Sequence, residues 1–542
     1  MNTAPSRDHS APSSASELPA RQARVWRQIC HMAEGLAIAP AIDSLIRHDA
    51  VVARADTNVP SASSCNPGFV GVARRALAQQ GRLTPGDAAN HDWLRRLDDY
   101  RHVPALLDLC HALLAGEPGN AQRATAPLLR AWSVASDFPD RIATELLAFV
   151  AAPTLLTLAD SGCLPPFRPE SFPLPADVWP VGAAGRHAQA ALRWLGWVDG
   201  PAAAPQLTTE GRMAAAFSGQ FRYPLSYLPM LTRMDSLLFG DPGIALARSG
   251  DATERHLDRA ADIRFSTEVF QRSCAPVLSA MAVPLFHRSR GDSRPRVVVD
   301  VGCGEATLLV SLLRAIASDP ASADAAENLL LVGVENNPVA EQAAKRTLAT
   351  CGAKHVLIRG DISYPDAIAA RLAVDGIDFA DALHVNKSVI HDRELVDASP
   401  SEATQAERHG ARAGLPGANA GDGIFARPDG SLVDASAAQD DLVRFFRRWR
   451  PYLARHGMIA LEPHALTVDA AAALSGRSMT AVMEALHGFS GQYLVTLDRF
   501  TEAIGASELC LAAQRLIGSE LTGHVHMSCS HLVAKRDSRH GL

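Results

Sequence analysis

The apolar positions of this 542-residue chain change their spacing near residue 294. Before that point they recur every three or four residues, as in Val25, Ile29, Met32 and Leu36, and this period predicts helices. The predicted helices cover residues 24–46, 70–80, 143–158, 188–195 and about 251–288. After residue 294, short aliphatic runs alternate with helical segments, and this order of elements predicts a mostly parallel α/β sheet.

The second half of the chain contains short runs that fit the strands of one sheet. They span 297–299, 329–334, 356–358, 379–385, 458–461 and 524–533. An amphipathic helix is predicted over 440–456, with a buried stripe formed by Leu442, Phe445, Phe446, Trp449 and Leu453. Residues 395–438 are poor in apolar positions, and we expect a flexible insertion there, either a flap over the substrate or a plain surface loop.

The first half contains a helix, a second helix and a short hairpin in the order typical of a winged helix. The hairpin is indicated by Gly196-Trp-Val-Asp-Gly200 and by Leu207-Thr-Thr-Glu-Gly211. We predict two degenerate winged-helix-like units between residues 20 and 220. Their helices are rich in Ala and Leu and have few basic residues to face phosphates, so packing or dimerisation is favoured over DNA binding.

Composition narrows the class of protein without choosing a function. A hydrophobic share of 47%, a charged share of 20% and a net charge of −6 fit a globular protein with no general affinity for nucleic acid or anionic membranes. The 9 cysteines include no C-x-x-C pair, which favours a reducing, cytoplasmic location. We also judge that no run approaches the roughly 20 apolar residues that cross a bilayer.

We therefore divide the chain into a disordered Ser/Ala/Pro-rich tail and three regions. The tail, which lacks the apolar core of a signal peptide, covers residues 1–20. A helical, winged-helix-like region covers 21–220, linker and lid helices cover 221–293, and the α/β domain covers 294–536.

The first strand of the α/β domain ends in a glycine turn. Asp300, Gly302 and Gly304 follow a β-branched run and precede a helix whose apolar face includes Leu308 and Leu312. This turn presents backbone N–H groups at the carboxyl end of a parallel sheet, where doubly wound folds bind nucleotides. Alone, such a turn is as compatible with a structural role as with a cofactor site.

Acidic residues at the ends of the next two strands make the cofactor interpretation specific. Glu335 ends the second strand and is placed to accept the ribose hydroxyls of an adenosine, with Asn336 beside it. After the third strand, Asp361 would lie beside the adenine and Ile362 would pack on its face. S-adenosylmethionine (SAM) is favoured over NAD because Thr307 occupies the third glycine position of the NAD motif and no separate catalytic domain follows.

Three histidines are predicted to gather at the same edge of the sheet. His391 follows the fourth strand, His464 the fifth, and His487 lies in the segment that ends in Gln492. Methyl transfer needs titratable groups when the nucleophile must lose a proton, so these histidines are candidate catalytic residues. With Gln492 they are also candidate ligands for a divalent metal, and the alternative is a structural role.

A set of motifs resembles the methyltransferases of apratoxin-type polyketide starter modules and their free-standing bacterial relatives. The motifs occur over roughly residues 190–500. In chain order they are Tyr223-Pro-Leu-Ser-Tyr-Leu-Pro-Met-Leu231, Leu238-Phe-Gly-Asp241, His256-Leu-Asp-Arg259, Asp300-Val-Gly-Cys-Gly304, His384-Val385, His391-Asp-Arg393, Trp449-x-Pro-Tyr452, Leu461-Glu-Pro-His464 and His487-Gly-Phe-Ser-Gly-Gln-Tyr493.

The resemblance implies a class I Rossmann-like methyltransferase domain with a seven-stranded, mostly parallel sheet, preceded by a helical lid region. It implies a small acyl or carboxylic substrate, free or carrier-bound, and in some members C-methylation of a malonyl-type thioester assisted by iron. Within the motifs we expect substrate contacts from Tyr227, Arg259, Arg393 and Gln492. Ile390 and Gly491 stand where relatives commonly have Asp, and 262–267 departs from the relatives' Gly-rich segment, which weakens the metal prediction.

The predicted function is a SAM-dependent methyltransferase of secondary metabolism, with a homodimer expected through the N-terminal region. An alternative is methylation of a free small molecule, either an amino acid sulfur or a hydroxy or oxo acid. A winged-helix regulator that senses SAM ranks last.

Overall fold

The computed structural model describes residues 18–51, 65–83, 93–116, 140–162, 172–173, 183–246, 255–396, 423–518 and 522–535. They divide into two compact units. One lies within Met1–Leu36 and Pro104–Phe221, and the other within Ala37–Val103 and Arg222–Leu542. Most of the predicted 1–20 tail and residues 397–422 of the predicted insertion lie outside the described residues.

The first unit is mainly helical. It contains the first part of α1 (Leu18–Arg47), α4 (Val103–Leu114), α6 (Arg141–Asp160), α7 (Ala183–Trp194), α8 (Thr209–Phe217) and the short helix η4 (Ser218–Phe221). Asp140 caps α6 by accepting a hydrogen bond from the Ala143 backbone N–H, and α6 is apolar and buried along most of its length. The predicted helices at 24–46, 143–158 and 188–195 are confirmed.

The predicted hairpin is also present in this unit. Strands β2 (Val198–Asp199) and β3 (Gln206–Leu207) pair antiparallel, and β1 (Phe172–Pro173) adds to the other side of β3. Gly211 lies so close to this hairpin that a Cβ atom there would meet the Trp197 carbonyl oxygen at 1.9 Å. The helices and hairpin follow the order from which a winged-helix-like unit was predicted, and the classification itself stays a prediction.

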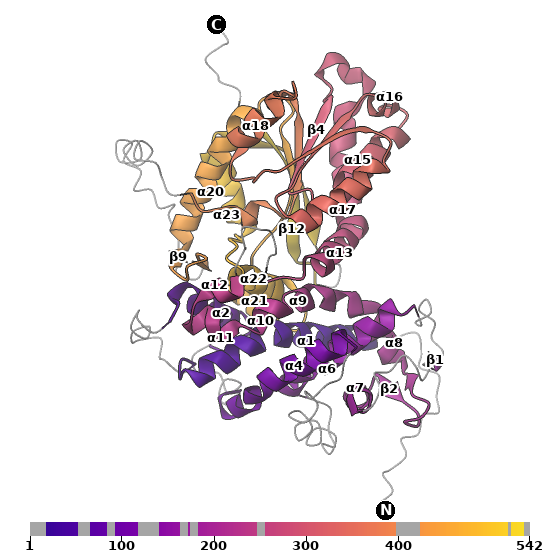
Figure 1. Ribbon diagram of the computed structural model, residues 1–542, viewed down its shortest axis with the longest axis vertical. Coiled ribbons are helices and arrows are strands. Elements are labelled where there is room, and N and C mark those ends of the chain that lie inside the picture. The colour runs from indigo at the N-terminus through magenta and orange to yellow at the C-terminus, as the bar shows by residue number, and fades with distance from the viewer. Residues whose placement is uncertain are drawn as a thin grey trace, which may run out of the picture. The chain divides into compact units, whose positions relative to one another are not determined.

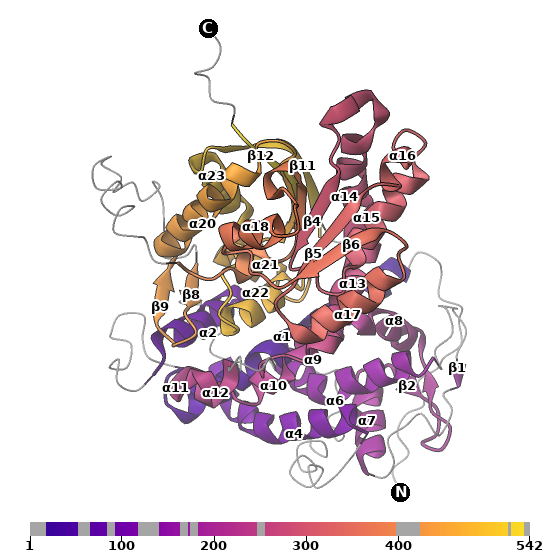
Figure 2. The same ribbon diagram turned by 45° about the horizontal axis from the view of Figure 1, so that its top comes forward.

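The second unit is built around a seven-stranded sheet with the order β11-β12-β10-β7-β4-β5-β6. The strands β4 (Val297–Val301), β5 (Leu330–Val334), β6 (Lys354–Ile358), β7 (Leu383–Lys387) and β10 (Met458–Pro463) are parallel. The strands β12 (Val525–Ala534) and β11 (Leu509–Gly518) complete the sheet in antiparallel pairing. The predicted class I α/β fold is confirmed, and Figure 2 shows β4, β5 and β6 side by side.

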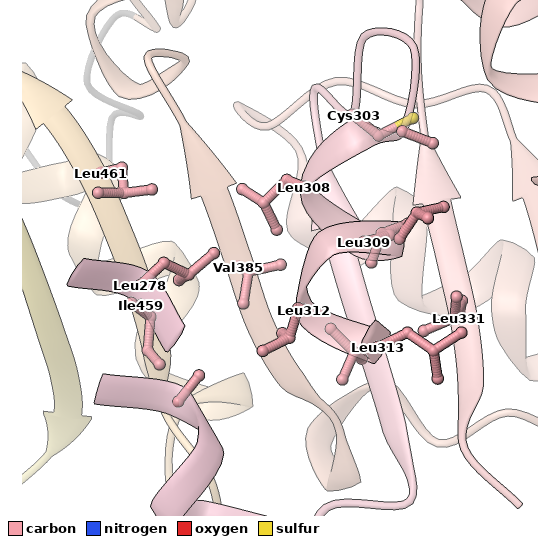
Figure 3. Packing of buried hydrophobic residues seen from close by; sticks show 14 of the residues in the cluster. Leu278, Cys303, Leu308, Leu309, Leu312, Leu313, Leu331, Val385, Ile459 and Leu461 are labelled. Atoms are coloured by element: carbon pink, nitrogen blue, oxygen red, sulfur yellow. The ribbon is translucent and has the colours of Figure 1, made fainter. Parts of the chain in front are cut away.

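Helices cover both faces of this sheet (Figure 1). They include α15 (Thr307–Ser318), α16 (Ala323–Ala326), α17 (Pro338–Ala349), α18 (Pro365–Ala373), α20 (Ala435–Trp449) and α23 (Leu497–Ala506). Leu308, Leu309 and Leu312 of α15 lie against strand residues such as Val385 and Ile459 (Figure 3). Burying such side chains contributes roughly 1.5–3 kcal/mol each, which fixes the strand ends that form the site.

Several predicted elements differ from the structure. Residues Phe379–Asp381 form a 3-10 turn (η8) capped by Asp378, so β7 begins only at Leu383. The end of the predicted insertion folds into the hairpin β8 (Ile424–Ala426) and β9 (Leu432–Asp434), followed directly by α20. Strand β11 was not predicted because its apolar residues do not alternate regularly along an edge strand.

A further set of helices belongs to this unit. It comprises α2 (Pro67–Gln79), η2 (Leu97–His102), α9 (Arg222–Ser226), α10 (Leu228–Leu231), α11 (Met234–Phe239), α12 (Pro242–Leu246), α21 (Val468–Leu474) and α22 (Thr480–Phe489). Helix α2 packs against α22, and Arg75 and Glu484 form a buried ion pair at 2.7 Å between them.

The segment before the sheet is one long helical run with a widened turn. Helix α13 (Arg259–Val269) continues through the π-helical turn η5 (Phe270–Cys274) into α14 (Ala275–Ala282), followed by the 3-10 turns η6 (Val283–Phe286) and η7 (Arg288–Ser293). The α14 part buries Leu278 and Ala282 in the core, whereas α13 has no fully buried residue. The two ends of the run therefore have different surroundings.

Contrary to the sequence prediction, three helical segments are long and apolar enough to cross a membrane by length and composition. They are Leu18–Arg47, Arg141–Asp160 and Arg259–Phe286, whose apolar windows are 94%, 89% and 28% buried. The 18-residue windows include alanine and small polar residues, which is why a search for continuous apolar runs passed over them.

Candidate active site

A cavity of about 510 Å³ opens at the carboxyl ends of the parallel strands in the second unit. All of the predicted cofactor residues line it, namely Asp300, Gly302, Gly304, Glu335, Asn336, Asp361 and Ile362. So do Tyr227, Arg259, His391, His487 and Gln492. The structure thus brings the predicted cofactor residues and most of the predicted acceptor residues into one cavity.

The glycine turn is held in a conformation that favours glycine at two positions. Gly302 has a φ of +74° and Gly304 a φ of +56°, which lies in the left-handed region. The backbone N–H of Gly302 donates to the Val334 carbonyl at 2.8 Å, which ties the turn to β5. A Cβ on Gly302 would meet Val389 Cγ2 at 2.5 Å, whereas one on Gly304 would have nothing within 4 Å. The turn is closely packed on one side and open on the other.

Glu335 is held by the backbone around it. Its Oε2 accepts the Gly304 N–H at 2.8 Å, and its Oε1 accepts the N–H groups of Asn336 at 2.9 Å and Asn337 at 2.8 Å. Burial raises the pKa of Glu335, and these hydrogen bonds oppose the rise. The carboxylate is therefore fixed at the end of β5, where a ribose would be bound.

Asp300 and Asp361 are also buried carboxyl groups. Burial, together with the neighbouring Glu335 carboxylate, raises the pKa of Asp300 to about 8. Among the described residues no group bonds to Asp300 Oδ1. Asp361 accepts the Ser363 N–H at 2.7 Å, and burial raises its pKa. An unpaired buried carboxyl oxygen beside an open glycine turn fits a cationic ligand such as SAM.

His391 and Glu462 form the closest polar pair near the acceptor half of the cavity. Glu462 Oε1 lies 2.6 Å from His391 Nδ1 and also accepts the His391 backbone N–H at 2.9 Å. Both side chains are buried, 3% exposed each. Because Glu462 accepts at Nδ1, the ring carries its proton there, and Nε2 is left as the basic nitrogen.

His487 lies edge-on to His391, with ring centroids 4.5 Å apart. Its Nδ1 is 2.8 Å from the Met483 carbonyl oxygen, and the Tyr223 hydroxyl is 3.3 Å from its Nε2. Burial, and then the nearby His391, lower the pKa of His487 well below the usual value. A neutral His487 adds no second positive charge next to His391.

Two predicted site residues lie elsewhere. His464 does not line the cavity, since its Nε2 bonds to the Ser528 hydroxyl on β12 at 2.8 Å and its ring packs on Phe500. Arg393 does not line it either and forms a buried ion pair with Asp441 at 2.7 Å. A substrate would have to break that pair to reach Arg393, so the geometry favours a structural role, and the predicted substrate contact stays a prediction.

Several lining residues were not predicted. Lys387, at the end of β7, donates from Nζ to the Ser266 hydroxyl of α13 at 2.7 Å. Asp262, Phe265 and Met483 also line the cavity. The sequence held a signal for Lys387, because this residue follows the strand that was expected to face the reactive methyl group. A lysine at a strand end is usually exposed to solvent, however, so it was not selected.

The predicted metal ligands do not converge. Within the described part of the chain, one group of three His, Cys, Asp or Glu residues has ligand atoms within 4.8 Å of one another, and it consists of His31, Glu34 and Glu145 in the first unit. His391, His464 and His487 are not such a group, and His464 faces away from the cavity. The histidines therefore do not fit a shared metal, and we derive no step through one.

A doubly wound sheet with a glycine turn after its first strand, and with acids after the next two strands in one cavity, is the arrangement of a class I SAM-dependent methyltransferase. Residues 254–517 match the family model described as an AprA MT2-like domain. This match confirms the resemblance found in the sequence for these residues. No curated protein sequence matches the chain.

Solved structures of methyltransferases align with the chain at low similarity. An O-methyltransferase family protein from Burkholderia thailandensis is 13% identical, with 70% of this chain and 94% of that chain covered and a TM-score of 0.39. Mitomycin 7-O-methyltransferase MmcR is 14% identical, with 77% and 100% covered and a TM-score of 0.37. The CurJ carbon methyltransferase is 10% identical, with 76% and 97% covered and a TM-score of 0.32. Their acceptors do not transfer to this chain.

Proposed function

We propose that the protein methylates a small acyl or carboxylic acceptor of secondary metabolism, with His391 as the general base. The observation that carries this proposal is that His391 lines the cavity that also contains the predicted cofactor residues and is paired with the buried Glu462. Bound SAM supplies an electrophilic methyl group on a sulfonium. A nucleophile that must lose a proton needs a base within reach, and His391 Nε2 is that base.

The residues around His391 fix its position and its proton. Glu462 holds the Nδ1 proton and stabilises the imidazolium that forms when Nε2 accepts a proton, as a carboxylate does for any histidine base. The His391 carbonyl accepts the Tyr493 N–H at 2.7 Å, which fixes the backbone. His487, neutral and in edge contact, keeps the ring from turning.

The proton-transfer role favours an acidic C–H or O–H acceptor over a thioether sulfur, which has no proton to lose. A carbonyl group next to the acceptor atom makes a C–H acidic enough for histidine to remove. The proposed acceptor is therefore a carbonyl compound with an acidic α-position, presented as a free acid or as a thioester.

The test is methyl transfer from radiolabelled SAM to an acceptor panel. The panel contains malonate, the N-acetylcysteamine thioester of malonate, the same acyl group on an acyl carrier protein, and homocysteine. We expect labelled product from at least one carbonyl acceptor and a loss of roughly 100-fold or more with His391→Gln. Transfer to homocysteine alone, or full turnover by His391→Gln, would overturn the proposal.

A further inference from the structure

Lys387 is a positive charge placed in a cavity that binds a positively charged cofactor. It ends β7, lines the cavity and is partly buried, and its ammonium group is tethered to Ser266 Oγ at 2.7 Å. Strand β7 is the central strand between β4, which carries Asp300, and β10, which carries Glu462. The ammonium therefore lies between the cofactor half and the His391–Glu462 half.

The charged and titratable groups that face Lys387 come from the surrounding elements. They are Asp262 of α13, Cys274 of η5, Asp300 of β4 and Glu462 of β10. Burial lowers the pKa of Lys387, and these groups oppose that effect. Among the described residues, no carboxylate forms an ion pair with Lys387 Nζ. The ammonium group has three N–H donors, and the bond to Ser266 uses one of them, so donors remain for a further acceptor.

A buried ammonium next to a sulfonium cofactor would disfavour cofactor binding unless a negative charge separates the two. Arg259 also lines the cavity, but it bonds to Asp262 at 3.0 Å. The predicted metal site is not formed by the histidines. Arg359 lines the cavity as well and pairs with Glu341 at 2.9 Å. Among the described cationic side chains of the cavity, Lys387 is therefore the one that is left for an anionic oxygen.

We propose that Lys387, oriented by Ser266, binds the carboxylate or enolate oxygen of a carbonyl acceptor and takes the charge-stabilising place that a metal would have. This inference rests on the proposed function. In the step, His391 Nε2 takes the α-proton, and the α-carbon electron pair forms a bond to the methyl carbon. The carbon–sulfur bond of SAM breaks, its electrons stay on sulfur, and the ammonium of Lys387 keeps its protons while donating to the oxygen.

The first experiment measures binding, so that it does not depend on turnover. Calorimetric titration of malonate into the enzyme loaded with S-adenosylhomocysteine (SAH) should show binding that Lys387→Met weakens at least tenfold. The matched control is Lys345→Met, an exposed lysine of α17 that is paired with Glu341. Malonate affinity unchanged in Lys387→Met, or undetectable in the wild type, overturns the inference.

The second experiment measures the pH dependence of methyl transfer with an acceptor from the panel above. Because Lys387 must be protonated, wild-type activity should fall on the alkaline side. Lys387→Arg, which stays charged, should lose that fall, whereas Lys387→Met should lose at least 100-fold in turnover. Ser266→Ala should raise KM more than it lowers kcat, because it removes only the tether.

The outcomes separate this inference from the proposed function. Malonate binding that depends on Lys387, with no methylation of any carbonyl acceptor, contradicts the proposed function but not the anion site. Methylation that persists in Lys387→Met with SAH affinity intact contradicts the anion site alone. If Lys387→Met does not bind SAH, the Lys387→Arg pH profile decides, and an alkaline fall identical to that of the wild type overturns the inference.

Discussion

Glu462 accepts two hydrogen bonds from His391, one from its backbone N–H and one from its ring Nδ1. The same carboxylate thus fixes both where the ring stands and which ring nitrogen carries the proton. Replacing Glu462 by Gln keeps the size of the side chain but removes the charge that stabilises an imidazolium. We expect turnover to fall roughly 100-fold, within the range of general-base contributions, while SAH affinity changes less than about twofold.

A matched control for that variant is Glu484→Gln. Glu484 is a buried glutamate paired with Arg75 and does not line the catalytic cavity. It should lower the unfolding temperature by breaking a buried ion pair without a comparable effect on kcat. Equal losses of kcat in both variants would mean that Glu462 acts only through stability.

Glu335→Gln should weaken the binding of SAH by roughly 1–3 kcal/mol, because hydrogen bonds from a ribose to a charged acceptor are lost. Isothermal titration measures this directly. Glu508→Gln is the control, since Glu508 pairs with Arg450 and neither residue lines the cavity. An affinity that is the same in the wild type and in Glu335→Gln would disprove the ribose contact.

Binding of SAM should release protons near neutral pH. In the free cavity burial and Glu335 raise the pKa of Asp300 to about 8, so this carboxyl is mostly protonated at pH 7. The cationic groups of SAM favour its ionised form, which lowers the pKa and expels the proton. Affinity should rise as the pH increases from about 6 to 8.

Calorimetry in buffers of different ionisation enthalpy measures that proton release. Asp300→Asn cannot ionise and should show less release and a flatter pH dependence of affinity. Heats that do not vary with the buffer in the wild type, or equal release from the variant, would rule out Asp300 as the source.

The glycine turn predicts a graded series of stabilities. Gly302→Ala should destabilise the protein both through a left-handed φ, at roughly 1–2 kcal/mol, and through the contact of the new Cβ with Val389. Gly304→Ala has a left-handed φ but open space, so it should cost only the first part. Adding Val389→Ala to Gly302→Ala should recover part of the loss. Equal unfolding temperatures for the two single variants would contradict the packing described here.

His464→Gln tests the placement of His464 outside the cavity. Turnover should stay within about threefold of the wild type, in contrast to His391→Gln. Burial lowers the pKa of His464 to about 4, below the roughly 6.5 of an unfolded histidine. The native state therefore binds the proton less tightly, and the stability contributed by neutral His464 is lost as the pH falls from about 6.5 through 4. Thermal unfolding of His464→Gln between pH 7 and pH 4 should show a smaller acid loss than the wild type.

The cofactor half of the site could be predicted because its signals are local. Asp300, Glu335 and Asp361 each end a strand that the sequence marks by itself, and the carboxyl ends of parallel strands meet at one edge. The run Val297–Val299 marked the first strand, and the apolar face with Leu308 and Leu312 marked the helix after it. Both depend on short-range patterns of apolar residues and glycine.

The acceptor half depends on contacts that no local pattern reveals. Glu462 was noted in its motif, but its partner His391 lies 71 residues away. Arg393 was assigned to substrate because Asp441, which neutralises it, belongs to a helix that begins beyond the insertion. His464 was misplaced because pairing of β12 beside β10 supplies Ser528 as its partner. Lys387 was missed because only the folded cavity shows that it is enclosed.

The π-helical turn Phe270–Cys274 separates the wall of the cavity from the packing of α14 on the sheet. Such a turn holds one residue more than a regular α-helical turn while leaving the flanking residues on their faces. Ser266, upstream of the turn, thus lines the cavity, whereas Leu278, downstream of it, packs in the core. Substitutions on the upstream side can change which acceptors are admitted while the scaffold keeps its stability. Directed evolution can therefore address the acceptor range of this enzyme at α13 without altering the packing of α14 on the sheet.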